Sequence, residues 1–320
     1  MHKNFGSYPD LRQSNPCTVR PCRTLHRLLY VILCFLVFVS DLSDFAIAGT
    51  AQHRVFPDTQ DHALQKLLTK SLDSLNLTSM LEKNKLSVTL VDITDVDQPA
   101  LAHINGANTY YAESLPKLAI LLAVYEEAHQ GNLDLDESVQ QKLDNMIRKS
   151  SNRDSTSLWE LVGPVRLAEI LRSDRYRLYD EKTGGGLWVG KAYAKNKLWK
   201  RDPLANFSHA ASGIQAARFF YMLQRGELVN PQYSHEMKNI LADSAINHKF
   251  VKGLAARQPE AKIYRKSGTW RTYHSDSALI ERDDGHTYIA VVLSDTTEGG
   301  RLLEKIIVSL DQVIDEYHSR

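Results

Sequence analysis

Cysteine is scarce in this chain and is confined to one end of it. Cys17, Cys22 and Cys34 are its only cysteines, so residues 49–320 have none. This part can therefore use neither disulfides nor a thiolate nucleophile nor cysteine-bound zinc. An excess of one charge is also missing, because 39 Lys+Arg and 38 Asp+Glu give a net charge of +1. Such a balance creates no general field for nucleic acid.

Glycine and proline are also few, with 16 and 10 among 320 residues. These counts exclude a collagen-like chain, and an apolar content of 43% excludes general disorder. The mean hydropathy of −0.34 excludes a polytopic membrane protein. What remains is an ordinary globular protein of one large or two small domains.

Residues 1–48 differ from the rest of the sequence. An apolar run from Leu28 to Val39 is preceded by several basic residues and followed by Ala46-Ile47-Ala48. These are the parts of an export signal, and the run is too short to span a bilayer unaided. We therefore expect residues 1–48 to be a signal peptide or, alternatively, an uncleaved N-terminal anchor. Either one predicts that residues 49–320 are periplasmic or extracellular, and an anchor would tether them to the inner membrane.

Hydrophobic periodicity predicts strands near both ends of the exported part and helices between them. Helices are expected at 62–75, 115–129, 137–149, 155–162, 213–225, 232–241 and 300–317, and strands at 86–93, 100–111, 261–270, 274–282 and 287–294. Residues 173–212 show no clean period and predict a long ordered loop. Without βαβ alternation, the order predicts the α+β class. We expect a five-stranded antiparallel sheet flanked by helices, with an inserted helical subdomain.

The segment Ser114-Leu115-Pro116-Lys117 stands at the start of a long predicted helix. Serine and lysine three positions apart lie on one helix face, and proline suits the first turn. A buried lysine at the positive end of a helix can act as general base to the hydroxyl. The alternative is an N-cap serine followed by a solvated lysine.

Two further segments carry suitable polar groups. Lys266-Ser267-Gly268-Thr269 lies in a predicted strand, where a lysine and a hydroxyl can bind a substrate carboxylate and glycine leaves room along the edge. Ser150-Ser151-Asn152 lies between two predicted helices, where a hydroxyl can relay a proton and an amide can hold a substrate. Taken separately, they also fit an edge strand blunted by lysine and an ordinary N-cap.

In this order the three segments resemble the S-x-x-K, S-x-N and K-[ST]-G motifs of the serine β-lactamase and penicillin-binding-protein superfamily. The resemblance covers about residues 55–318 and is strongest to the class A-like branch, including class A-related serine hydrolases. It implies that Ser114 is the acylated nucleophile, Lys117 its proton acceptor and Ser150 a proton relay. The backbone N–H groups of Ser114 and Thr269 would form the oxyanion hole.

The resemblance also implies the substrate-binding residues. They are Asn152 for the substrate amide, and Lys266, Ser267, Gly268 and Thr269 for the side that carries the carboxylate. It implies no cofactor and no metal. The substrate would be a small-molecule or peptidoglycan-derived amide, with no nucleic acid partner, and contact with a membrane would be made only through the leader.

Three departures from the family pattern bear on function. The interval from Ser114 to Ser150 is shorter than in classical class A enzymes, and Ser151 stands where aspartate is usual. No Glu-x-x-Leu-Asn segment, which carries the deacylating glutamate, is present. Glu181 is a candidate for that base by its location alone.

The sequence thus supports an exported serine hydrolase of the class A β-lactamase-like group that forms an acyl-enzyme on Ser114 and hydrolyses a β-lactam or related amide. The missing glutamate motif favours an alternative, a penicillin-binding-protein-like D,D-peptidase or transpeptidase acting on peptidoglycan. A third hypothesis is a non-catalytic binding protein with the same fold.

Overall fold

The computed structural model describes residues 56–194 and 197–320. The chain divides into two units at Arg54, and all described residues lie in the second, compact unit, Val55–Arg320. The predicted signal peptide or anchor at 1–48 therefore lies outside the described residues. Within the part that is described, no helix is long and apolar enough to cross a membrane.

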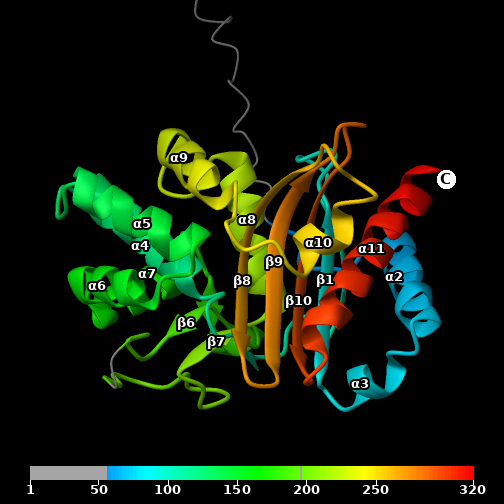
Figure 1. The fold of residues 1–320 in the computed structure, drawn as a ribbon, viewed down its shortest axis with the longest axis horizontal. Coiled ribbons are helices and arrows are strands. Elements are labelled where there is room, and N and C mark those ends of the chain that lie inside the picture. Colours follow the sequence, from blue (N-terminus) through cyan, green and yellow to red (C-terminus); the bar gives the residue numbers. More distant parts are fainter. Residues whose placement is uncertain (1–55, 195–196) are drawn as a thin grey trace, which may run out of the picture. The chain divides into compact units, whose positions relative to one another are not determined.

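A five-stranded antiparallel sheet forms the centre of the second unit (Figure 1). Its strands are β1 (Leu86–Asp92), β2 (Ala100–Ile104), β8 (Lys262–Trp270), β9 (Tyr273–Glu281) and β10 (Thr287–Asp295), in the order β2-β1-β10-β9-β8. Strands that precede and follow the helical segment thus form one sheet, and the predicted α+β architecture is confirmed. Strand β8, which contains the Lys-Ser-Gly segment, pairs only with β9 in this sheet and lies at its edge.

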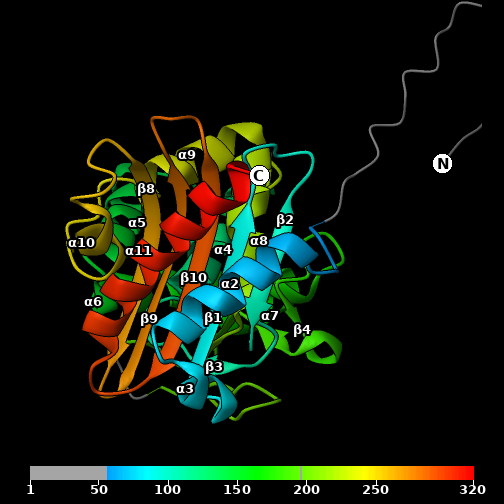
Figure 2. The ribbon, with the colours of Figure 1, turned by 90° about the vertical axis from the view of Figure 1, so that its right-hand side faces the viewer.

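Alternating apolar residues supply the two faces of the sheet with separate cores. In β10, Ala290 and Val292 belong to one cluster of buried side chains, and Ile289 and Val291 belong to the other. The period of two is what places successive side chains on opposite faces. Helices α2 (His62–Ser74) and α11 (Gly299–His318) cover the first face (Figure 2), and α8 (Gly213–Arg225) packs on the second.

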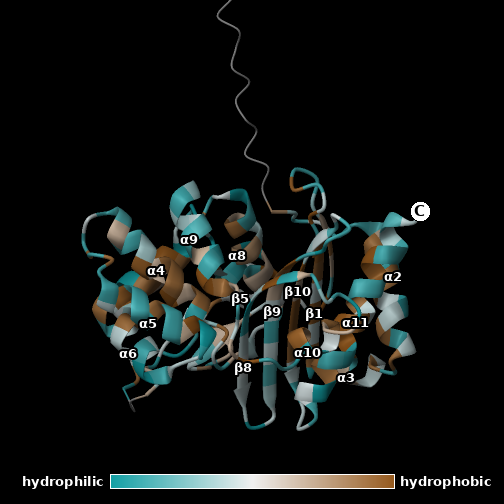
Figure 3. Ribbon diagram, turned by 45° about the horizontal axis from the view of Figure 1, so that its top comes forward, coloured by the Kyte–Doolittle hydropathy of each residue, from teal (hydrophilic) through white to brown (hydrophobic). Residues whose placement is uncertain are grey.

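A group of helices adjoins the second face. It comprises α4 (Lys117–His129), α5 (Glu137–Arg148), α6 (Asn152–Val162), α7 (Pro164–Arg172) and α9 (Pro231–Leu241). Helix α4 is buried from its first residue through Glu127, and Figure 3 shows it as a largely apolar ribbon among amphipathic neighbours. This burial makes α4 the central helix of the predicted subdomain. Because Lys117 is the first residue of α4, the side chain of Lys117 is buried as well.

The predicted strand at 100–111 is wrong in its second half. Strand β2 ends at Ile104, and Asn105 then takes a left-handed backbone angle, φ 59°. The Asn105 amide donates to the carbonyls of Leu81 and Leu86, at 2.8 and 2.9 Å, which holds the turn in place. The chain continues as β3 (Tyr110–Tyr111), a strand of a second sheet.

The predicted loop at 173–212 carries short strands. In the second sheet β3 pairs with β7 (His209–Ala211), which pairs with β6 (Trp188–Val189). A further pair joins β4 (Tyr179–Asp180) to β5 (Gly185–Gly186). Helix α7 and the short helices α3 (Thr78–Glu82) and α10 (Phe250–Leu254) were not predicted. Helices α3 and α10 have only five residues each, which is too few turns to show a period.

Candidate active site

Ser114 lies in a tight turn immediately before α4. The Lys117 backbone N–H donates to the Ser114 carbonyl at 3.2 Å, and the Leu118 N–H donates to the Leu115 carbonyl at 3.1 Å. These bonds span three residues and form a turn of 3₁₀ type, which is common at helix starts. Pro116 fits there because a first turn needs no N–H from it. Ser114 is half-buried, whereas Lys117 is fully buried.

The Lys117 ammonium is surrounded by neutral oxygen atoms. Its Nζ donates to the Ser150 carbonyl at 2.7 Å, to the Asn152 Oδ1 at 2.9 Å and to the Ser150 Oγ at 3.3 Å. It also lies 4.7 Å from the centre of the Tyr193 ring. Burial lowers the pKa of Lys117 to about 7. A large fraction of the amine is therefore free of its proton near neutral pH, as a general base must be.

Ser150 reaches Lys117 because the chain turns sharply just after α5. The backbone φ of Ser150 is 56°, in the left-handed region that non-glycine residues seldom adopt. The next residue, Ser151, caps α6 by accepting a hydrogen bond from the Asp154 N–H at 3.2 Å. Ser151, the middle residue of the S-x-N segment, therefore begins a helix, while its two neighbours contact Lys117.

Lys266 reaches the same serine from strand β8. Its Nζ donates to the Ser150 Oγ at 3.0 Å and to the Ser267 carbonyl at 2.8 Å. Burial lowers its pKa well below the ordinary value, and the charge of Lys117 lowers it further. The Ser150 hydroxyl thus lies between two lysines from separate parts of the chain. We call Lys117, Ser150, Asn152 and Lys266 the base cluster.

Strand β8 becomes exposed to solvent beyond Gly268. Ser267 and Gly268 are buried, and Thr269 is exposed. The structure therefore brings all three predicted segments together. It places Ser114 one turn from Lys117, although Ser114 itself makes no side-chain hydrogen bond that ties it to the cluster among the described residues.

Lys249 is a polar residue of this region that the sequence analysis did not select. It is buried, and its Nζ donates to the Gly268 carbonyl, to the Thr269 Oγ1 at 2.9 Å and to the Ser275 carbonyl at 3.0 Å. Burial lowers its pKa to about 8, against the opposite effect of Asp276. No motif marks this lysine, because its contacts are made with strands that lie 19 to 26 residues further along the chain.

A model of the Beta-lactamase enzyme family matches residues 68–162 and 138–317 of this sequence. The chain belongs to the beta-lactamase enzyme family. The matched region includes the turn at Ser114, the base cluster and all of strand β8, so the polar contacts described above lie inside the part that defines membership. Among curated proteins, none matches the sequence.

Solved structures of family proteins have the same fold. PBP-A has 15% identity and a TM-score of 0.58, over 75% of this chain and 96% of its own. A representative class A beta-lactamase from Bacteroides cellulosilyticus DSM 14838 has 18% identity and a TM-score of 0.61, over 81% and 99%. A variant of the last common ancestor of Gram-negative bacteria beta-lactamase class A has 17% identity and a TM-score of 0.61, over 80% and 100%. At such identities, the likeness establishes the fold.

Glu181 does not join the base cluster of this beta-lactamase-family protein. It lies in a 3₁₀ turn at Glu181–Thr183, its side chain is 51% exposed, and its carboxylate pairs with Arg172 at 2.7 Å. Position in the sequence had suggested it as a deacylating base. Its contacts are those of a surface ion pair.

The aromatic residue Tyr193, not a carboxylate, lies against Lys117. Its ring stacks on His209 with centres 4.1 Å apart, and its buried hydroxyl has no hydrogen-bond partner among the described residues. Burial lowers the pKa of His209 to about 4, so this histidine is neutral at physiological pH. Its Nε2 lies 2.9 Å from the Lys191 carbonyl. His209 thus holds the loop and supplies no charge to the site.

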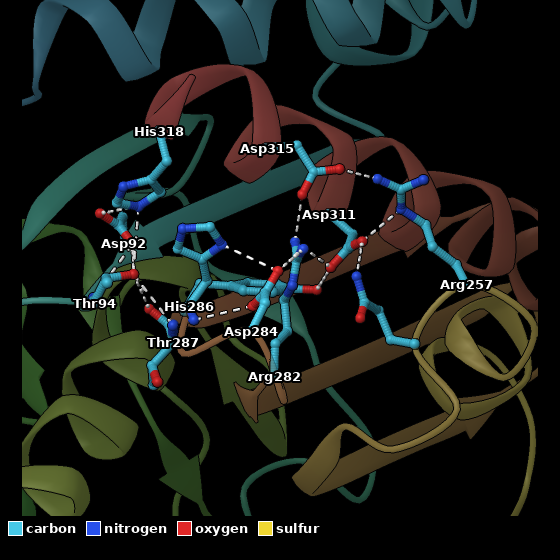
Figure 4. Close-up of polar contacts among 12 residues, drawn as sticks. Asp92, Thr94, Arg257, Arg282, Asp284, His286, Thr287, Asp311, Asp315 and His318 are labelled. Carbon is cyan, nitrogen blue, oxygen red and sulfur yellow. Dashed lines mark hydrogen bonds and ion pairs between the residues drawn. The ribbon is translucent and has the colours of Figure 1, made fainter. Parts of the chain in front are cut away.

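A second polar cluster joins α11 to the turn between β9 and β10 (Figure 4). Asp284, His286 and Asp315 form the one group, in the part of the chain that is described, whose metal-ligand atoms all lie within 4.8 Å of one another. Arg282 pairs with Asp284, with Asp315 at 2.7 Å and with Asp311 at 3.3 Å. Arg257 also pairs with Asp311 and Asp315. Because two arginines already pair with these carboxylates, we interpret the cluster as an ion-pair network that holds the end of α11.

Proposed function

We propose that this protein is an exported serine enzyme that forms an acyl-enzyme on Ser114 with a β-lactam or a related peptidoglycan-derived amide. The observation that carries the proposal is the base cluster, in which a buried lysine one turn from a serine donates, as far as the structure describes the chain, to neutral oxygen atoms. Such a lysine can accept the serine proton at neutral pH, and a solvated lysine with an ordinary pKa cannot.

Acylation would begin with proton transfer from the Ser114 hydroxyl to the Lys117 amine. The Ser114 Oγ then bonds to the substrate carbonyl carbon, and the carbonyl oxygen takes the negative charge. Backbone N–H groups of Ser114 and Thr269 would hold that charge. When the C–N bond breaks, the leaving nitrogen takes a proton from the Ser150 hydroxyl, which recovers one from the Lys117 ammonium. The Ser114 proton thus ends on the leaving nitrogen, the carbonyl re-forms as the ester, and Ser150 and Lys117 return to their starting protonation states.

The substrate would be positioned by the edge of strand β8. A carboxylate would bind at Lys266, Ser267 and Thr269, and the Lys249 ammonium, which donates to the Thr269 Oγ1, would add a second positive charge. The Asn152 amide would hold the substrate amide while its oxygen orients Lys117. A fixed array of this kind lowers the barrier because it needs no rearrangement in the transition state.

The environment of Lys117 favours a long-lived acyl-enzyme over rapid hydrolysis. Among residues 56–194 and 197–320, the hydrogen bonds of Lys117 go to Ser150 and Asn152, and no carboxylate pairs with its ammonium. Without a second base to activate water, the ester would persist. This observation supports the penicillin-binding-protein-like alternative, in which an amine from peptidoglycan or a slow water molecule releases the acyl group.

Intact-protein mass spectrometry after exposure to benzylpenicillin tests the proposal. An adduct that forms and stays would support the penicillin-binding-protein-like reaction, and one that forms and decays would support β-lactam hydrolysis. The Ser114→Ala variant, checked for folding by circular dichroism, should form none. If the natural protein forms no adduct with any acylating probe, the enzymatic proposal is wrong and a binding role remains.

A further inference from the structure

The acylation mechanism makes no use of Glu113, although this residue directly precedes Ser114 in the chain. Its side chain is buried, and its backbone has φ 50°, in the left-handed region. A conformation of this kind is strained in a residue other than glycine and persists only where the surroundings impose it. The surroundings of the Glu113 carboxyl therefore bear on how the nucleophile turn is held.

The Glu113 carboxyl occupies the space that a side chain at Gly268 would need. A Cβ at Gly268 would lie 2.3 Å from the Glu113 Oε2 and 2.7 Å from the Ala112 carbonyl oxygen. The Ser275 hydroxyl donates to the same Oε2 at 2.7 Å, and Ser275 lies opposite Gly268 in the pairing of β8 with β9. The other oxygen, Oε1, is buried and has no hydrogen-bond partner among the described residues.

These contacts join the two backbone positions that the mechanism needs. Glu113 precedes Ser114, and Gly268 precedes Thr269, so one carboxyl connects the residues that stand before both oxyanion-hole amides. An ionised carboxylate with an unpartnered oxygen is costly in a buried position, and a neutral acid costs much less. The geometry therefore suits a protonated Glu113.

We propose that Glu113 is a positioning residue, whose neutral carboxyl holds the Ser114 turn against Gly268 and Ser275 and so sets the spacing of the Ser114 and Thr269 amides. The proposal rests on acyl transfer at Ser114 and extends it. Ionisation of Glu113 would place a negative charge beside the site where the oxyanion develops, and acylation would slow because like charges repel.

Several titratable groups surround Glu113. Burial raises its pKa to about 8, and the charges of Lys249 and Lys266 oppose that rise. Tyr111 and Tyr193 also face it, and the charge of Glu113 adds to the burial that raises their pKa values. Glu113 therefore remains protonated at neutral pH and ionises as the pH rises through about 8.

The test measures the rate at which a fluorescent penicillin labels the full-length protein across the alkaline range. In the natural protein the rate should fall about tenfold per pH unit above about pH 8. Glu113→Gln keeps the shape and the acceptor for Ser275 but cannot ionise. The labelling rate of this variant should stay, up to about pH 10, within about twofold of its rate at neutral pH. A Glu113→Gln profile that falls like that of the natural protein would overturn the inference.

Ser275→Ala provides a second test that does not alter the glutamate. The Ser275 hydrogen bond lowers the pKa of Glu113, so its loss should raise that pKa and move the alkaline fall to higher pH. An unchanged position of the fall would count against the proposal. If Glu113→Gln fails to fold, this variant still decides the question.

Two control variants test whether the alkaline fall belongs to Glu113. Glu126 is also a buried glutamate, near the far end of α4, and Glu126→Gln should keep the fall unchanged. In Lys249→Met the loss of a positive charge should raise the pKa of Glu113 and move the fall in labelling rate to higher pH. If the fall vanished in Lys249→Met and persisted in Glu113→Gln, Lys249 would be its cause and the inference would be wrong. Absence of labelling in the natural protein would instead refute the proposed function itself.

Discussion

Two buried lysines, Lys117 and Lys249, lie in contrasting surroundings. Within the described part of the chain, the hydrogen-bond partners of Lys117 are all neutral, the oxygens of Ser150 and Asn152. Lys249 donates to backbone carbonyls of β8 and β9, and the charge of Asp276 raises its pKa. Burial lowers the pKa of both, to about 7 and about 8. In both lysines burial lowers the pKa, and at Lys249 a nearby carboxylate opposes that effect.

The largest expected effect comes from removing the amine of the base cluster. Lys117→Met should slow penicillin labelling of Ser114 about 10³-fold, because general-base catalysis is lost. The labelling rate of the natural protein should also rise about tenfold per pH unit up to about pH 7, since only the free amine accepts a proton, and then level off until the Glu113-dependent fall begins above about pH 8. Lys249→Met is the matched control and should lose much less at neutral pH. Equal losses in the two variants would show that the two lysines do not differ in role.

The next effect is on stability and concerns the buried pair behind Lys249. Arg265 and Asp276 are almost fully buried and lie 2.7 Å apart. Asp276→Ala should lower the free energy of unfolding by about 3–5 kcal/mol, because an unpaired buried charge remains. Urea denaturation measures this loss. A change below about 1 kcal/mol would mean that Arg265 finds water or another partner.

Substitutions of Ser150 should have a smaller effect, which can be separated into a loss of labelling rate and a change in stability. Ser150→Ala and Ser150→Gly both remove the hydroxyl between Lys117 and Lys266, and both should slow labelling about 10²-fold. Glycine adopts the left-handed backbone freely, so the glycine variant should be about 1 kcal/mol more stable than the alanine variant. Labelling kinetics and thermal unfolding measure the two parts separately. An alanine variant that labels at the natural rate would remove Ser150 from the proton path.

The smallest expected effect is at Glu181. Glu181→Gln should leave the lifetime of the acyl adduct within about twofold of the natural value, because its carboxylate pairs with Arg172 at the surface. The same substitution should change the free energy of unfolding by less than about 1 kcal/mol. Mass spectrometry of the adduct over time decides the first point. A much longer-lived adduct in this variant would identify Glu181 as the deacylating base after all.

Sequence periodicity predicted the regular elements well where one face of an element is apolar. The last three strands, the closing helix and the edges of α2, α5 and α8 lie within a few residues of their predicted positions. It failed at Asn105, where a side-chain amide turns the chain by binding two distant carbonyls. Such bonds leave no period in the sequence.

The candidate site was predictable in part. Three motifs identified Ser114, Lys117, Ser150, Asn152 and the Lys266 segment, and the structure brings those segments together. Glu113 and Lys249 were not found, because neither belongs to a motif and both act through strands far along the chain. Glu181 was selected by its position in the sequence, and that position did not indicate that its carboxylate pairs with Arg172.

The amino-acid sequence by itself determined the α+β class, the order of the five strands of the central sheet along the chain and the three motifs that suggest acyl-transfer chemistry. Local hydrophobic spacing and motif order contain that information. Only the tertiary structure decided which lysines are buried, which oxygens surround them and that a glutamate fills the space at Gly268. Those properties depend on desolvation and on contacts between distant segments, and folding alone creates both.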